Sequence, residues 1–170
     1  IPKRDWSSDV CSSDLHPGDE QSVHLQLFPD IPAAWRNDEL AARWAKIRDL
    51  RRVVTGAIEK ERAEKKIGAS LQAYPLIYVE AVPGEFASLA ADERSEIFIT
   101  SGHEFKTEPA PADAFRLPDV AGIAVKVTPA AVQKCERCWR VLPEVGTHAA
   151  HPTLCGRCED AVGQAPQAAQ

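Results

Sequence analysis

Two Cys-x-x-Cys pairs near the end of the chain constrain its fold more than any other feature. Cys135 and Cys138 form the first pair, Cys155 and Cys158 form the second, and sixteen residues separate the pairs. Each pair places two sulfurs on one metal, and the second pair completes the tetrahedral shell that Zn²⁺ prefers. Four protein ligands leave no position for water or substrate, so we expect one structural zinc ion. Such a site folds a segment that buries too little apolar surface to order itself.

Disulfide bonds, a redox dithiol and an iron–sulfur cluster are the alternatives to a zinc site for these cysteines. Two disulfides would suit an oxidising compartment, but the sequence opens with no secretory signal. A redox dithiol needs only one pair, and an iron–sulfur cluster usually has a third closely spaced cysteine. His148 and His151 lie between the pairs; because four thiolates complete the shell, we leave both out of it, although either can donate to a ligand sulfur. The cysteine usage suits a reducing compartment, and we predict a cytoplasmic protein.

The first fifteen residues have an unusual composition. Residues 5–15 read Asp-Trp-Ser-Ser-Asp-Val-Cys-Ser-Ser-Asp-Leu, which looks like the conceptual translation of a sequencing adapter. We therefore interpret residues 1–15 as a non-native leader and exclude them, together with Cys11, from reasoning about the fold. The alternative is a genuine Ser/Asp-rich disordered leader.

Charge and hydropathy narrow the classes of function. The chain carries 25 acidic and 20 basic residues, a formal net charge of −5. Any contact with nucleic acid must therefore come from a local basic surface. No apolar run approaches the length of a membrane span, so we expect no membrane partner. No acid/base pair, nucleophile triad or Gly-rich phosphate loop is present, and we assign no catalytic and no cofactor-binding residue.

The sequence predicts a long helix over residues 38–66. Its apolar residues recur about every 3.6 positions and form a single stripe: Leu40, Trp44, Ile47, Leu50, Val54 and Ile58. Because no second helix of comparable length follows, we expect partner helices upstream of this chain. The helix is also rich in Lys and Arg, which either meet RNA phosphates or form i,i+4 pairs with acids, such as Glu61 with Lys65.

The hydrophobic period changes after this helix. We predict a buried strand over 74–82, a short helix over 83–94, two further strands over 97–100 and 123–128, and an exposed loop over 108–118. The expected fold class is α+β: a long helix from the end of a helical domain, a small mixed βαββ unit and a C-terminal four-cysteine zinc knuckle. The expected segments are 1–15 (leader), 16–70 (helical), 71–130 (α/β), 131–162 (zinc-binding) and 163–170 (disordered tail).

Four short motifs occur along the chain in a fixed order. They are Ser-Val-His-Leu at 22–25, Glu-Lys-Lys-Ile-Gly-Ala-Ser-Leu at 64–71, Thr-Ser-Gly at 100–102, which we place at the end of a strand, and the two cysteine pairs, the first within Lys-Cys-Glu-Arg-Cys-Trp. In order and spacing these motifs resemble the C-terminal end of bacterial isoleucyl-tRNA synthetases, a class I family. The resemblance covers nearly everything from residue 21 to residue 162.

The resemblance implies a parent enzyme, isoleucine–tRNA ligase, that attaches isoleucine to its tRNA using ATP and acts as a cytoplasmic monomer. It also implies that residues 16–70 end a helical anticodon-binding domain. The family's catalytic and editing motifs are absent from this sequence, so ATP binding belongs to the missing catalytic domain. We therefore expect the fragment to be inactive alone and to bind and position the tRNA for isoleucine.

Basic and aromatic residues around the cysteines are the candidates for tRNA contact. A Trp ring can stack on an unpaired base while neighbouring cations hold the phosphates. The candidates are Lys134, Arg137, Trp139, Arg140 and Arg157. The alternative for Trp139 is that its ring packs over the zinc loops as their small core.

Two other classes of protein share the cysteine spacing. A DNA glycosylase of the formamidopyrimidine type ends in a similar zinc finger, but it uses an N-terminal proline nucleophile and a helix-two-turn-helix. Here Pro2 follows Ile1 within the suspected leader, and a long helix with a βαββ unit precedes the finger. A bare zinc-ribbon interaction module fits the cysteines but leaves the upstream motifs unexplained.

Overall fold

The computed structural model describes residues 30–164. The expected leader at 1–15 with Cys11, the motif at 22–25 and residues 165–170 of the expected tail lie outside this range. The chain divides into two compact units, Ile1–Asp38 and Glu39–Gln170. The described part of the first unit contains a short 3-10 helix, η2 (Ala33–Trp35), followed by an ion pair in which Arg36 Nε lies 2.9 Å from Asp38 Oδ1.

The long helix forms where the apolar stripe predicts it. It is α2 (Asp38–Ala63), and it ends three residues before the expected position. Lys65 adopts a left-handed backbone conformation with φ of 59°, and its N–H donates to the carbonyl of Arg62. This turn carries Lys65 away from the i,i+4 direction. Lys66 instead lies 3.0 Å from Glu61 and 2.6 Å from Glu64, so the expected Glu61–Lys65 pair is replaced by one with Lys66.

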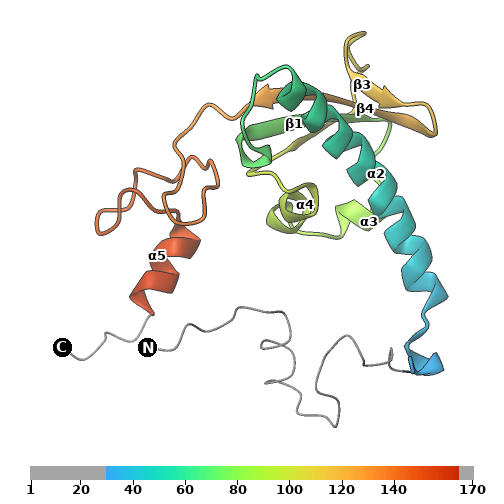
Figure 1. Ribbon diagram of the computed structural model, residues 1–170, viewed down its shortest axis with the longest axis horizontal. Helices are drawn as coiled ribbons and strands as arrows, with labels where there is room; N and C mark the ends of the chain where they lie inside the picture. Colours follow the sequence, from blue (N-terminus) through green and yellow to red (C-terminus); the bar gives the residue numbers. More distant parts are fainter. Residues whose placement is uncertain (1–29, 165–170) are drawn as a thin grey trace, which may run out of the picture. The chain divides into compact units, whose positions relative to one another are not determined.

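The sheet has four strands and mixed polarity (Figure 1). Its spatial order is β2 (Glu104–Lys106), β1 (Ala73–Val79), β4 (Val120–Pro129) and β3 (Phe115–Leu117). The β1–β2 pair is parallel, while β4 runs antiparallel to both β1 and β3. The central strand β1 is buried over most of its length, as the run of Leu, Ile, Val and Tyr predicts.

The strand predicted over 97–100 is wrong, because these residues end a helix. Two helices, α3 (Gly84–Ala87) and α4 (Ala91–Phe98), replace the single helix expected over 83–94. Ile99 then adopts a left-handed conformation with φ of 58°, and the N–H of Thr100 donates to the carbonyl of Ser95 at 2.9 Å. The β-favouring Ile-Phe-Ile-Thr run is overridden because helical geometry buries Ser95 and Phe98 together. The Thr-Ser-Gly motif at 100–102 therefore follows α4 and does not end a strand.

The segment over 108–118, expected to be an exposed loop, contains the edge strand β3. The Pro and Ala residues around this strand make the sequence read as a loop. This strand has only three residues, too few for a clear alternation of apolar and polar side chains. Together with β2, which the sequence also does not predict, it brings the sheet to four strands, of which only β1 and β4 are expected. Strand β4 is also longer than the predicted 123–128, since it begins at Val120 and ends at Pro129.

The main core lies between α2 and the sheet, which corrects the expectation that the apolar stripe needs helices upstream. Six buried residues of α2 contribute to this core: Ile47, Leu50, Val53, Val54, Ala57 and Ile58. They pack with Ile77 of β1, Val125 of β4 and Phe98 of α4. The first part of the stripe differs, since Leu40 is 47% exposed and Trp44 is 43% exposed.

The predicted fold class, α+β, is confirmed by a long helix, a four-stranded mixed sheet and a cluster of four cysteines. We call residues 39–129 the body and residues 133–163 the finger. The finger consists mainly of turns, with one bridge between Lys134 and Val141 and one helix, α5 (Gly156–Gly163) (Figure 1). The expected segment boundaries remain predictions. Across residues 30–164, every helix is too short or too polar to cross a membrane.

Candidate metal centre

The fold gathers the four paired cysteines into one cluster. The sulfurs of Cys135, Cys138, Cys155 and Cys158 all lie within 4.8 Å of one another. The sulfurs of Cys138 and Cys155, which belong to different pairs, are 3.6 Å apart. A tetrahedral zinc site with Zn–S bonds of about 2.3 Å has sulfur–sulfur distances of about 3.8 Å. Both the donor set and its spacing therefore fit a zinc ion.

A tight turn positions the first pair. The N–H of Cys135 donates to the carbonyl of Arg140 at 2.8 Å, and the N–H of Trp139 donates to the carbonyl of Cys135 at 2.9 Å. Trp139 has a φ of 66°, a left-handed conformation that is costly for a residue with a large side chain. The turn thus holds two sulfurs on one side and directs the chain back beside Lys134.

The second pair is positioned by the start of α5. Cys155 is the N-terminal cap of this helix, and Cys158 lies in its first turn, where its N–H donates to the carbonyl of Cys155 at 2.9 Å. Two hydrogen bonds with backbone N–H donors connect the segments that carry the two pairs. The N–H of Cys155 donates to the sulfur of Cys135 at 3.4 Å, and the N–H of Glu136 donates to the carbonyl of Thr153 at 3.1 Å.

Electrostatics make this cluster a site for a cation. Burial raises the pKa of the Cys155 thiol to about 12 and also raises the pKa of Cys138. Burial acts in the same direction on Cys135, but N–H donors from Cys138, Cys155 and Arg137 outweigh it and lower its pKa to about 6. The guanidinium of Arg137 adds one positive charge, since its Nη1 lies 3.6 Å from the sulfur of Cys158. Full ionisation of four adjacent thiols therefore requires a further cation, which Zn²⁺ would supply.

Apolar packing in the finger is slight. Its buried cluster consists of three of the cysteines and Val145, with Leu142 and Leu154 partly buried against it. A segment of this size with so small a core rarely folds without a staple. The small core and the thiol cluster together support a structural role for zinc, as the sequence predicts.

The two histidines of the finger remain outside the cluster. In the described part of the chain, the group able to hold a metal contains the four thiols and neither histidine. The Nδ1 of His148 lies 2.6 Å from Glu159 Oε2, and the carbonyl of His151 accepts a hydrogen bond from the N–H of Leu154.

The tRNA-contact candidates divide into two groups, of which the first lies on the turn of the first cysteine pair. Trp139 is 63% exposed, so its ring does not form a core over the zinc loops. The ammonium of Lys134 lies 5.9 Å from the centroid of that ring, within the range of a cation–π interaction. Arg137 is also exposed. We call residues 134–139, which carry these three exposed side chains, the 134–139 loop.

The second group, Arg140 and Arg157, is directed to helix α4. The side chain of Arg140 is only 11% exposed, and its Nη2 lies 3.0 Å from Asp92 Oδ1. Arg157 Nη1 lies 3.4 Å from Glu96 Oε1 in a pair exposed on both sides. Sequence reasoning did not identify Asp92 or Glu96, because neither carries a local signal of a partner more than forty residues away.

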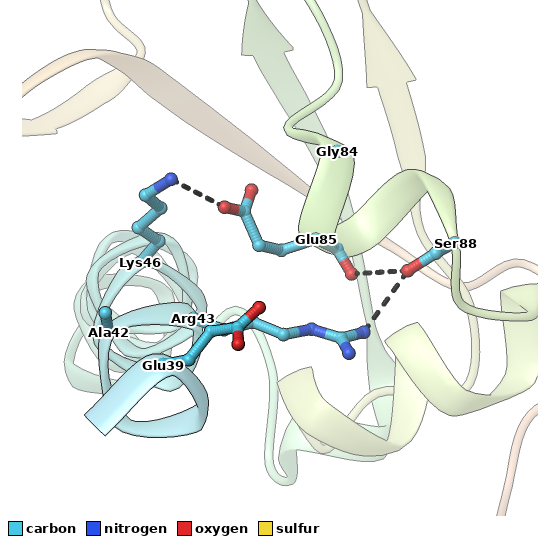
Figure 2. Close-up of a pocket in the computed structure, with 7 residues that line it drawn as sticks. All are labelled: Glu39, Ala42, Arg43, Lys46, Gly84, Glu85 and Ser88. Atoms are coloured by element: carbon cyan, nitrogen blue, oxygen red, sulfur yellow. Dashed lines mark hydrogen bonds and ion pairs between the residues drawn. The ribbon is translucent and has the colours of Figure 1, made fainter. Parts of the chain in front are cut away.

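The basic residues of α2 are also largely paired within the chain. A shallow groove of about 450 Å³ lies between α2 and α3 (Figure 2). Lys46 Nζ lies 2.7 Å from Glu85 Oε1 there, and Arg43 Nη2 donates to the hydroxyl of Ser88 at 3.2 Å. Further along the helix, Arg52 pairs with Asp119 at 2.6 Å. These pairs favour the interpretation of α2 as a helix fixed to its neighbours over that of an RNA-binding face.

One known protein family matches the finger. Residues 133–161 match the family described as a zinc finger found in FPG and IleRS. This description covers two classes of protein, so the finger alone does not distinguish the two functions considered from the sequence.

Comparison with curated proteins extends beyond the finger. The chain is 47% identical to the isoleucine–tRNA ligase of Ruegeria pomeroyi over 148 residues, which are 87% of this chain and 15% of that protein. It is 45% identical to the isoleucine–tRNA ligase of Agrobacterium fabrum over 139 residues, 82% of this chain and 14% of that protein. For the isoleucine–tRNA ligase of Bradyrhizobium diazoefficiens the identity is 44% over 156 residues, 92% and 16% respectively. The chain therefore spans about 15% of the length of these relatives.

Proposed function

Because this chain fits a C-terminal fragment of an isoleucine–tRNA ligase, we propose that it is the tRNA-binding and zinc-binding portion of such an enzyme. Cys135, Cys138, Cys155 and Cys158 hold one zinc ion with a structural role. The tRNA for isoleucine is the partner. The similarity covers the body as well as the finger, which favours this function over that of a glycosylase of the formamidopyrimidine type.

One observation carries the assignment of tRNA binding to the finger. The 134–139 loop contains two of the clustered cysteines and exposes an aromatic ring beside the ammonium of Lys134, and it also carries the exposed Arg137. A ring of this kind stacks on an unpaired base whatever its sequence, and the ammonium and guanidinium groups contact phosphates. Zinc supports this contact indirectly, because the backbone turn that presents Trp139 is also the turn that holds Cys135 and Cys138.

The chemistry of aminoacylation belongs to other parts of the proposed enzyme. The parent attaches isoleucine to tRNA with ATP, and this portion contributes by positioning the RNA. We propose that the chain alone has no ligase activity, that residues 16–70 end an anticodon-binding domain, and that the parent is a cytoplasmic monomer. Aminoacylation assays on the chain, with the complete enzyme as positive control, test its inactivity directly.

Fluorescence anisotropy with a labelled isoleucine tRNA tests the proposal. We expect binding that weakens between 50 and 200 mM salt, as contacts to phosphates require. Trp139→Ala should weaken binding by about five- to a hundredfold, the range for loss of one stacked base. The matched control is Trp35→Ala, since Trp35 is exposed but lies outside the finger.

Two outcomes would contradict this assignment. One is the absence of salt-sensitive binding, both in the chain and after its fusion to the catalytic domains of a relative. The other is equal affinity for Trp139→Ala and Trp35→Ala. Nicking of duplex DNA that carries an oxidised purine would favour the glycosylase instead.

A further inference from the structure

The hydroxyl of Ser101 connects the finger to the body. Ser101 is 4% exposed and lies in the Thr-Ser-Gly motif after α4. Its Oγ donates to the carbonyl of Leu71 at 2.7 Å and accepts a hydrogen bond from the N–H of Val141, also at 2.7 Å. One buried hydroxyl thus bridges the segment before β1, thirty residues earlier in the chain, and the finger, forty residues later.

Arg140 makes a second connection at the same place. Its guanidinium lies 3.0 Å from Asp92 Oδ1 and 3.4 Å from the carbonyl of Ser101. The arginine side chain is largely buried, whereas that of Asp92 is 81% exposed. The two acceptors belong to the start of α4 and to the turn that follows this helix, so Arg140 connects the finger to both.

The turn that receives these contacts is itself fixed. A Cβ atom at Gly102 would come within 2.9 Å of the ring of Tyr74 on β1, so only glycine allows this close approach. Thr100, the residue before Ser101, is also buried. The motif therefore combines a hydroxyl that accepts from the finger with a glycine that holds the turn against the sheet.

We infer that Ser101 and Arg140 are positioning residues that lock the finger onto the body and so fix the orientation of the 134–139 loop. This inference rests on the proposed function, because the loop is the proposed RNA contact. Arg140 and Val141 directly follow Trp139, and Val141 forms a bridge with Lys134. A change in these contacts is therefore transmitted to both ends of the loop.

The remaining connections restrain the finger less. The linker that follows β4 begins with a hydrogen bond from the N–H of Ala130 to the carbonyl of Gln72 at 2.8 Å. The Arg157–Glu96 pair is exposed on both sides, and such pairs contribute little. Without Ser101 and Arg140 the finger would sample several orientations, and RNA binding would have to select one of them.

The test separates the orientation of the finger from its folding. We would prepare the zinc-loaded chain as wild type, Ser101→Ala, Ser101→Thr and Arg140→Ala, with Glu96→Ala, which removes the exposed Arg157–Glu96 pair, as the control. Zinc content should remain one per chain in all five proteins, because none of these residues is a ligand. Residual dipolar couplings should give one common alignment for the body and finger of the wild type, and smaller averaged couplings for the finger in Ser101→Ala and Arg140→Ala.

The affinity for isoleucine tRNA should follow the same order. We expect Ser101→Ala and Arg140→Ala to bind about five- to tenfold more weakly, the effect of losing one buried hydrogen bond. Ser101→Thr, which keeps the hydroxyl, should restore most of the affinity, and Glu96→Ala should bind like the wild type. Should Arg140→Ala lose zinc, Asp92→Ala replaces it, because Asp92 is exposed and its loss releases the same guanidinium.

The outcomes distinguish the inference from the proposed function. Independent alignment of the finger in the wild type would overturn the inference, and so would wild-type affinity in both Ser101→Ala and Arg140→Ala. A wild-type chain that shows one alignment but binds no tRNA, even when fused to the catalytic domains, would contradict the proposed function and leave the lock itself established by the couplings.

Discussion

The body and the finger lie in the same compact unit but depend on different forces. The body buries a continuous apolar cluster in which α2 covers the sheet, whereas Val145 is the one fully apolar side chain in the finger's buried cluster. In place of a core, the finger has four thiols within 4.8 Å of one another. The contrast teaches that one unit can contain a part that folds by apolar burial and a part that requires a metal.

Metal removal should give the largest difference between the two parts. We expect chelation, or Cys155→Ser, to abolish the fold of the finger, because structural zinc contributes about 10–16 kcal/mol in isolated zinc fingers. Amide hydrogen exchange should show lost protection after residue 133 and unchanged protection in α2. Elemental analysis that finds one zinc per chain in Cys155→Ser would refute this prediction, as would simultaneous loss of protection in the body.

Shortening a buried side chain in the body core should destabilise the body and leave zinc binding by the finger unchanged. Leu50 is 1% exposed within the main cluster, so Leu50→Ala should lower the free energy of unfolding of the body by about 2–5 kcal/mol. Denaturant titration followed by circular dichroism measures this loss. Leu40→Ala on the same helix is the matched control and should cost less, since Leu40 is 47% exposed. Zinc content should not change in either variant, and loss of zinc in Leu50→Ala would show that the two parts do not fold separately.

Of the changes considered, acidification should have the smallest effect, which is a modest loss of stability in the body. His103 lies between Phe98 and Phe105, with each pair of ring centroids 5.4 Å apart, and its Nδ1 is 2.9 Å from Ser95 Oγ. Burial lowers the pKa of His103, and the positive charge of Arg94 lowers it further. The unfolded chain therefore binds a proton more readily than the folded one. The contribution of His103 is complete above the unfolded pKa of about 6.5 and is lost as the pH falls toward the lower folded value.

Thermal melts of the metal-free chain between pH 7.5 and 4.5 measure this dependence on the body alone, because acid also releases zinc from the finger. The melting temperature should fall below about pH 6.5, and His103→Gln should reduce that fall. An identical pH dependence in the wild type and in His103→Gln would exclude the proposed role of this histidine.

The sequence predicts features whose signal is local. The Cys-x-x-Cys spacing identifies the four clustered thiols, and the 3.6-residue stripe identifies α2 to within three residues at its end. The strand expected over 97–100 fails because capping decides the structure: Glu93 accepts from the N–H of Ala90 at 2.7 Å and starts α4. The sequence does not predict the contact between Ser101 and Val141, since the two residues are forty positions apart and neither has a sequence signal for the other.

The same limit applies to the tRNA-contact candidates. All five share charge or aromatic character near the cysteines, and the structure separates Arg140 from the other four, Arg157 included, by exposure. Lys134, Arg137 and Trp139 lie on the exposed 134–139 loop, while the side chain of Arg140 is largely buried against α4. Sequence proximity to a metal site therefore does not indicate which basic residues are accessible to RNA.

The metal dependence of RNA binding shows whether a zinc-folded finger carries the RNA contact of this chain. Anisotropy with isoleucine tRNA should be measured on the same preparation with zinc bound, after chelation and after zinc is restored. We predict that chelation weakens binding at least as much as Trp139→Ala does and that restored zinc returns the original affinity, while the body remains folded throughout. Equal affinity with and without zinc would show that the folded finger does not carry the RNA contact.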